Sequence, residues 1–271
     1  MDWWLTQLEW RVIDVRGVSK TFSFENQPTL ALSPTDLKIS TGSFVSLVGP
    51  SGCGKTTLLN MIAGLIEPTQ GSIVQDDQIV SGINTRVGYM TQQDNLLPWR
   101  TTAENVAMPL LIQGHSMASA KHRVTEMLQR VGIERFANHF PSQLSGGMRK
   151  RASLAQVLVY DPQTILMDEP FGALDAQLKV SMQMQLLSLW ENAGKTIVFV
   201  THDLTEAILL SDQVVVFSGR PGQIKDIVSI DLPRPRDPIK GQFNTQFQMI
   251  YQNLWEMLAP DIARLAKVEA S

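Results

Sequence analysis

The sequence predicts an α/β fold whose core is a mainly parallel sheet, and three observations indicate this class. Residues 43–48 form a short apolar run that leads at once into a glycine-rich segment and then a helical pattern, an order typical of parallel α/β units. Further apolar runs at 164–167, 196–200 and 214–217 alternate with helical segments. Residues 93–158 have helical periodicity with little β character. We therefore expect a core sheet with an α-helical subdomain attached to it.

The remaining elements follow from local patterns along the chain. Residues 12–18 alternate loosely and predict a strand, whereas 21–27 predict a turn or hairpin. The glycine-rich segment feeds a helix over 56–65, and residues 72–90 predict short strands joined by turns. A long helix is expected over 177–191.

The C-terminal part of the chain predicts a link and one helix. A proline-rich stretch, LPRPRDP, occupies residues 232–238. Beyond it, apolar residues recur with helical spacing, namely Phe247, Ile250, Tyr251, Leu254, Trp255 and Leu258. We favour a helix that covers apolar surface of its own domain, and the alternative is a regulatory or dimer-contact module. The expected division is a main domain over 1–238 and a helical extension over 239–271.

Composition excludes several classes of protein. The chain has 271 residues, of which 44% are hydrophobic and 18% charged, so wholesale disorder is excluded. A net charge of −3 gives no global attraction for nucleic acid or an anionic membrane. The single cysteine, Cys53, excludes an intramolecular disulfide and a zinc-finger framework. Short apolar runs and an acidic start at Asp2 predict neither a membrane span nor a signal peptide. We therefore expect a soluble cytoplasmic protein.

The strongest local motif is GPSGCGKT, which matches G-x-x-x-x-G-K-[ST] between the predicted strand and helix. Its glycines let successive backbone N–H groups turn toward a phosphate, and the helix N-terminus adds partial positive charge there. The lysine would supply charge at the β- and γ-phosphates, and the threonine hydroxyl would bind Mg²⁺. The alternative is a simple glycine turn. The motif comprises Gly49, Pro50, Ser51, Gly52, Cys53, Gly54, Lys55 and Thr56.

Two further features bear on this loop. Cys53 is either a reactive thiol near a helix N-terminus or a small residue that fits the loop, and we favour the second.

Residues 164–169 form an apolar strand that ends in two carboxylates, Asp168 and Glu169. A parallel strand would deliver Asp168 to the Mg²⁺ shell and Glu169 to the water that attacks the γ-phosphate, where it would act as general base.

A second glycine motif, LSGGM at 144–148, decides the family. With the phosphate loop and the acidic strand end, it closely resembles the nucleotide-binding subunits of ATP-binding cassette (ABC) transporters, in which the motif is usually LSGGQ. The Ser145 hydroxyl and the N–H groups of Gly146 and Gly147 would form a second anion cradle at a helix start. The resemblance implies a P-loop NTPase of ABC type, with an antiparallel β subdomain, a mainly parallel core sheet and an α-helical subdomain.

The resemblance assigns further residues in chain order. Phe22 aligns with the aromatic residue that stacks on adenine, and Thr57 extends the ATP-binding loop. Gln92, with Gln93 as the alternative, matches the glutamine that contacts Mg²⁺ and the attacking water. Asp175, in the motif GALD, matches the loop that crosses the dimer interface. His202 matches the switch histidine at the γ-phosphate. Each alone has a simpler explanation as a core or solvated residue, but their order makes coincidence negligible.

The resemblance also implies an assembly. Two chains would form a head-to-tail dimer in which each LSGGM segment closes over the ATP held by the other chain. Lys150 and Arg151, which follow that segment, either add positive potential near the phosphate or lie on a solvated helix face.

Within the family, the closest resemblance is to import ATPases of the nitrate/sulfonate/taurine group, which also includes bicarbonate importers. It rests on LLPWR at 96–100, the Met form of the signature, and RPG at 220–222 leading into DLPRPR. This group implies an ATP- and Mg²⁺-dependent ATPase on the cytoplasmic face of the membrane, bound to a permease dimer that works with an extracytoplasmic solute-binding protein. It would power uptake of a small anion such as nitrate, a sulfonate, bicarbonate or a carboxylate.

Two alternatives stay open. Leu97 and Trp99 are either hydrophobic anchors for the permease or core residues. The rival function is a soluble non-transport ABC ATPase in chromosome maintenance, DNA repair or translation. Such proteins usually carry long coiled-coil insertions or two tandem heads, whereas this chain has one head and a short helical insertion without sustained heptads.

Overall fold

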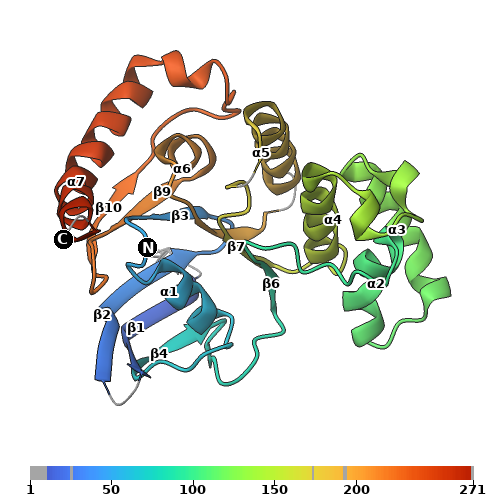
Figure 1. Ribbon diagram of the computed structural model, residues 1–271, viewed down its shortest axis with the longest axis horizontal. Coiled ribbons are helices and arrows are strands. Elements are labelled where there is room, and N and C mark those ends of the chain that lie inside the picture. The colour runs from blue at the N-terminus through green and yellow to red at the C-terminus, as the bar shows by residue number, and fades with distance from the viewer. Residues whose placement is uncertain (1–10, 25–26, 173, 192–193, 270–271) are drawn as a thin grey trace, which may run out of the picture.

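A computed structural model describes residues 11–24, 27–172, 174–191 and 194–269. Asp2 and the rest of the chain start, together with Ala173 of the GALD motif, lie outside these residues. The described chain has two sheets and a lobe of helices, and the lobe lies on the opposite side of the core sheet from the C-terminal helix (Figure 1).

The antiparallel subdomain is a four-stranded sheet in the order β2-β1-β4-β5. Its strands are β1 (Arg11–Phe24), β2 (Gln27–Ser40), β4 (Gln70–Gln75) and β5 (Gln78–Ile79). The predicted turn at 21–27 is narrower than expected, because β1 and β2 pair as far as Phe24 opposite Gln27. The sequence did not indicate β2. Pro28 and Pro34 weaken its strand pattern, and burial alternates clearly only in its second half.

The core sheet has six strands in the order β10-β9-β3-β8-β7-β6. The strands β3, β6, β7, β8 and β9 pair in parallel, and β10 closes one edge in antiparallel pairing. Every residue of β3, β7 and β8 is buried, which explains their continuous apolar runs. The strands are β3 (Phe44–Val48), β6 (Val87–Met90), β7 (Thr164–Asp168), β8 (Thr196–Val200), β9 (Gln213–Phe217) and β10 (Ile224–Ser229).

The helical lobe occupies the part of the chain where the sequence predicts it. It contains α2 (Thr102–Ile112), α3 (Met117–Arg130) and α4 (Gly146–Leu158), with two short 3₁₀ turns between α3 and α4. A capping box fixes the start of α2, because Thr101 accepts from the Glu104 amide and the Glu104 carboxylate accepts from the Thr101 amide.

The other helices pack on the core sheet. They are α1 (Lys55–Ile62), α5 (Ala176–Glu191) and α6 (Leu204–Leu210). One apolar cluster runs from the helical lobe through α5 into the sheet. The sequence did not indicate α6, a short helix that Asp203 caps by accepting from the amides of Thr205 and Glu206.

The C-terminal helix α7 (Thr245–Glu269) follows a short 3₁₀ turn, η3 (Gly241–Phe243). Phe247, Leu254 and Leu258 of α7 are buried in a cluster with residues of α6 and β9. The helix therefore covers apolar surface of its own chain, as favoured from the sequence. Among the described helices, none is both long and apolar enough to cross a membrane.

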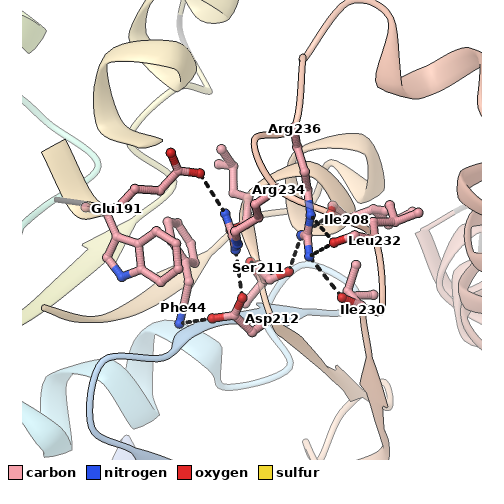
Figure 2. Close-up of polar contacts among 12 residues, drawn as sticks. Phe44, Glu191, Ile208, Ser211, Asp212, Ile230, Leu232, Arg234 and Arg236 are labelled. Carbon is pink, nitrogen blue, oxygen red and sulfur yellow. Dashed lines mark hydrogen bonds and ion pairs between the residues drawn. The ribbon is translucent and has the colours of Figure 1, made fainter. Parts of the chain in front are cut away.

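The proline-rich link is bound tightly to the core rather than extended between two units. Figure 2 shows Arg236 aimed at backbone carbonyls, and its buried guanidinium donates to those of Ile208, Ser211, Ile230 and Leu232. Burial and the neighbouring arginine charge lower the pKa of Arg236 to about 10, so it stays charged at neutral pH.

A second arginine ties the link to α5. The Arg234 guanidinium lies over the Trp190 ring at 4.3 Å and pairs with Asp212 at 2.8 Å and Glu191 at 3.6 Å. Ring stacking and ion pairing therefore hold the link against the core. The predicted division at 238/239 stays a prediction.

Candidate functional site

The phosphate loop opens into a cavity of about 490 Å³. Residues from β1, β2, the loop itself and the ends of β6 and β7 line it. Of the predicted site residues, the cavity brings together Phe22, Ser51, Gly52, Gly54, Lys55, Thr56, Thr57, Gln92 and Glu169. Phe22 is 42% exposed, so its ring is available to stack on a ligand, and the Lys20 ammonium lies 5.3 Å from the ring centre.

The loop has the backbone that its glycines predict. Gly52 and Gly54 adopt φ of 72° and 93°, and a Cβ at Gly54 would lie 2.9 Å from the Ala31 carbonyl oxygen. Lys55 begins α1 and is buried, where its Nζ donates to the carbonyls of Gly49 and Pro50, each at 2.8 Å. The lysine thus lies within the curve of the loop, where a phosphate would be bound.

Cys53 contributes no side chain to the cavity lining. Its side chain is completely buried in an apolar cluster with residues of β3 and α1, and its Sγ lies 3.5 Å from Lys55 Nζ. Burial agrees with the favoured interpretation of Cys53 as a small residue that fits.

Two oxygen groups that could bind a metal ion, a hydroxyl and a carboxylate, meet at the edge of the loop. The Thr56 hydroxyl donates to Asp168 Oδ1 at 3.0 Å, which joins the start of α1 to the end of β7. Burial raises the pKa of the Asp168 carboxyl above its ordinary value, although the Thr56 hydrogen bond opposes this. Among the described residues, no group of three or more His, Cys, Asp or Glu could hold a metal ion. A hydroxyl beside one carboxylate suits Mg²⁺ that takes its other ligands from phosphate and water.

Two other predicted site residues, Gln92 and His202, contact the carboxylate of Glu169. Gln92 Nε2 donates to Glu169 Oε2 at 3.1 Å, and His202 Nδ1 lies 3.3 Å from the same oxygen. These side chains come from the ends of β6, β7 and β8, which are neighbours in the sheet. The parallel sheet therefore explains why residues 110 positions apart in sequence meet at one carboxylate oxygen.

The backbone at Glu169 is strained. Its φ is 44°, a left-handed conformation that is uncommon for residues other than glycine. The Glu169 amide donates to the Val200 carbonyl at 2.9 Å, so the neighbouring strand end holds this geometry. Strain of this kind concentrates at functional sites, where surrounding structure maintains it.

The LSGGM segment does not line this cavity. Ser145 caps α4 by accepting from the Met148 amide at 3.3 Å. A Cβ at Gly147 would lie 2.0 Å from the Leu178 side chain, so this glycine also has a packing role, whereas a Cβ at Gly146 would be unobstructed. Asp175 is exposed and accepts from the Leu178 amide at the start of α5.

The structure reveals two ion-pair clusters that sequence patterns did not identify. Lys150 is only 4% exposed, donates to the Gln92 carbonyl at 2.5 Å and pairs with Asp94 at 3.1 Å. It therefore joins the helix after LSGGM to the Gln92 loop and does not lie on a solvated face. Lys179 of α5 pairs with Asp203 at 2.7 Å and Glu206 at 2.9 Å.

This second cluster flanks His202, because Asp203 follows it directly and Thr201, which precedes it, donates to Glu206. The ion pairs therefore link the helix that begins after Asp175 to the segment that carries the histidine. Only the positive charge of Lys150 was noticed from the sequence, and no local pattern signalled its burial.

Comparison with known proteins decides the family. A family model described as ABC transporter matches residues 32–172. An uncharacterized ABC transporter ATP-binding protein of Methanocaldococcus jannaschii is 44% identical over 231 residues, which are 85% of this chain and 86% of that protein. The chain belongs to the ABC transporter family. It is accordingly an ABC-type ATPase, as the resemblance predicts.

Named relatives confirm the predicted import group. The aliphatic sulfonates import ATP-binding protein SsuB of Bacillus cereus is 38% identical over 85% of this chain and 91% of its own. The taurine import ATP-binding protein TauB of Yersinia pestis is 44% identical over 76% of this chain and 81% of its own.

A solved structure confirms the predicted ABC ATPase fold. A dimeric ATP-binding cassette, in a post-hydrolysis state with ADP and Pi, superposes with a TM-score of 0.74 at 34% identity. The match covers 82% of this chain and all of that one.

The ABC helical lobe leaves Trp99 on its surface. The Trp99 side chain is 71% exposed, whereas Leu96 is buried and Leu97 is intermediate. The core-packing alternative for Trp99 is therefore wrong.

Proposed function

We propose that this chain is the ATP-hydrolysing subunit of an importer for a small anion, such as a sulfonate, taurine, nitrate, bicarbonate or a carboxylate. The names of two relatives, SsuB for sulfonates and TauB for taurine, support this class of cargo. The cargo would pass through a permease, so discrimination among these anions would lie outside this chain.

Nucleotide binding is assigned to the cavity at the phosphate loop. Phe22 would stack on adenine, and Lys55 with the loop amides would hold the phosphates. Thr56, Asp168 and Gln92 would hold Mg²⁺, which neutralises charge on the β- and γ-phosphates when bound. The 3.0 Å contact between Thr56 and Asp168 supports their shared role.

Hydrolysis is assigned to Glu169, and its shared carboxylate oxygen is the observation that carries the proposal. Gln92 and His202 both contact Glu169 Oε2, at 3.1 and 3.3 Å. Glu169 would accept a proton from the attacking water, while Gln92 and His202 would orient the water and the γ-phosphate. General-base assistance of this kind contributes about 10²- to 10⁴-fold to a rate.

We assign completion of each site to a second copy of the chain. Ser145, Gly146 and Gly147 lie outside the cavity lining, which supports the inference that they close over the ATP of a partner copy. Asp175, exposed at the start of α5, would contact the partner across that interface. The dimeric relative supports this assembly. Closure upon ATP binding would then move the attached permease.

The remaining partners are a permease dimer and, indirectly, an extracytoplasmic solute-binding protein, with the chain held peripherally on the cytoplasmic face of the membrane. The exposed Trp99 and the neighbouring Leu97 are our candidates for the permease contact.

A detergent pull-down of tagged Glu169→Gln chain with ATP, followed by mass spectrometry, tests the transporter assignment. We expect a multi-span membrane protein at about equal stoichiometry, which would then identify the permease for cargo screening. Wild-type chain without nucleotide is the matched control for the bait. Recovery of only chromosomal or ribosomal partners would instead support the soluble non-transport alternative.

A further inference from the structure

A segment after β9 contacts the phosphate loop directly. Arg220 Nε donates to the Gly52 carbonyl at 2.8 Å. The guanidinium lies against Gly52 so closely that a Cβ there would be 2.2 Å from it. Two residues on, a Cβ at Gly222 would lie 1.7 Å from the Cys53 carbonyl oxygen. The RPG segment, residues 220–222, therefore packs against two successive carbonyl groups of the phosphate loop, those of Gly52 and Cys53.

The RPG segment is also fixed to the strand that lines the cavity. The Gly222 amide donates to the Ala31 carbonyl at 3.1 Å, and its carbonyl accepts from the Ser33 amide at 2.8 Å. Leu32 and Gly222 form an isolated parallel bridge. Ala31 itself lines the nucleotide cavity, as Arg220 does. A rigid support thus joins β2, the RPG segment and the phosphate loop.

On its other side, the same segment is held by α7. Asp261 accepts from Lys225 Nζ at 2.9 Å and from the amide of Gly219, the residue before Arg220. These bonds hold the pKa of Asp261 below its ordinary value even though burial opposes this. Lys225 also donates to the Met257 carbonyl of α7. The C-terminal helix therefore reaches the phosphate loop through two contacts in series.

We propose that Arg220 is a positioning residue for ATP binding, and that α7 sets its position through Asp261. This inference rests on the proposed function, because it assigns the support of the same nucleotide site. A guanidinium bound to the Gly52 carbonyl fixes that peptide plane and polarises its N–H, which belongs to Cys53 and donates across the loop to the Pro50 carbonyl at 3.4 Å. A loop held in one shape loses less conformational freedom when phosphate binds. Neither effect touches Glu169, so affinity changes and chemistry does not.

The test compares four variants of the full chain by ATP affinity in the presence of Mg²⁺ and by steady-state hydrolysis. Arg220→Ala should raise both the Kd and the KM for ATP about fivefold to tenfold, with kcat changed less than about twofold. Arg220→Lys, which keeps a charged donor near the carbonyl, should recover part of the affinity. Asp261→Asn should weaken affinity about twofold to threefold. Arg264 lines a neighbouring cavity of about 710 Å³ together with Arg220 but does not line the nucleotide cavity. Arg264→Ala therefore removes an equal charge nearby and should leave affinity unchanged.

Four results would overturn the inference. An unchanged Kd in Arg220→Ala removes the positioning role, and a fall in kcat at constant KM assigns Arg220 to chemistry instead. Equal losses of ATP affinity in Arg220→Ala and Arg264→Ala would mean that Arg220 acts through general positive potential and not by positioning the loop. Strict additivity in an Arg220→Ala/Asp261→Asn double variant breaks the link to α7, because residues acting in series are not additive.

Two controls keep this test separate from the proposed function. Lys55→Ala must weaken ATP binding in the same assay, and if it does not, the assignment of the cavity fails before Arg220 is judged. Circular dichroism and urea unfolding of each variant establish that it is folded. If Arg220→Ala proves unfolded, Arg220→Gln takes its place with the same expected increase in KM.

Discussion

Replacement of Arg236 by methionine should destabilise the chain by about 3 kcal/mol. The arginine is 8% exposed and donates five hydrogen bonds to four backbone carbonyls. Two acceptors, those of Ile208 and Ser211, belong to the end of α6, where a helix leaves its last carbonyls without intrahelical partners. Methionine fills similar volume but donates nothing.

The magnitude follows from opposing terms. A buried acceptor left without a donor costs about 1–3 kcal/mol, so four of them set an upper limit near 12 kcal/mol. Removing the arginine also removes the cost of burying its charge, which amounts to several kcal/mol, and water can reach carbonyls near the surface. About 3 kcal/mol remains.

Urea unfolding of the full chain measures this difference. Arg130→Met is the matched control, because Arg130 and Glu126 form an exposed i,i+4 pair 3.6 Å apart and contribute at most about 0.5 kcal/mol. Hydrogen exchange should show that α6 and α7 open first in Arg236→Met. A loss below about 1 kcal/mol, or one no larger than that of Arg130→Met, would refute the reasoning.

Three further predictions follow from single side chains. Lys179→Met should lower kcat at least about tenfold with less effect on ATP affinity, because Asp203, next to His202, loses its ion pair; an unchanged kcat would contradict the coupling. Cys53→Ser should keep ATP turnover within about twofold, because the buried side chain fills space and does not line the cavity, and an inactive variant would give the thiol a direct role. Trp99→Ala should reduce recovery of membrane-bound complex while ATP binding holds, whereas Phe243→Ala, which truncates another strongly exposed aromatic side chain, should not; equal loss would count against a specific permease contact.

Most of the fold could be predicted because its signals are local. The strands at the centre of the sheet are buried on both faces and so read as continuous apolar runs, as at β7 and β8. The phosphate loop is recognisable because its glycines must stand at fixed positions. Strand β2 was not predicted, because two prolines interrupt its alternating pattern and its pairing with β1 is decided by tertiary structure.

The site could be predicted in its parts but not in its connections. Glu169 was assigned from its strand end, and Gln92 and His202 through the family resemblance. The parallel sheet explains why the three meet, because the end of each strand delivers one residue. For Lys150 the sequence left open a role near the phosphate and a solvated helix face, because it does not show that Asp94 and a loop carbonyl will surround the side chain. Likewise, the sequence shows Arg236 only as part of a proline-rich link and does not show that backbone carbonyls will surround its guanidinium. Long-range ion pairs depend on packing, and nothing in the local pattern encodes them.

The ATP-dependent assembly of the Glu169→Gln chain, measured by light scattering during size-exclusion chromatography with Mg²⁺, tests the proposed mechanism most directly. We expect a monomer of 30.2 kDa that becomes a dimer with ATP, while turnover falls about 10²- to 10⁴-fold. Ser145→Arg introduced into the same chain should prevent the dimer and leave ATP binding intact, because its cradle would serve the partner's nucleotide. A Glu169→Gln chain that stays monomeric with bound ATP, or that hydrolyses ATP at nearly the wild-type rate, would contradict the proposed mechanism.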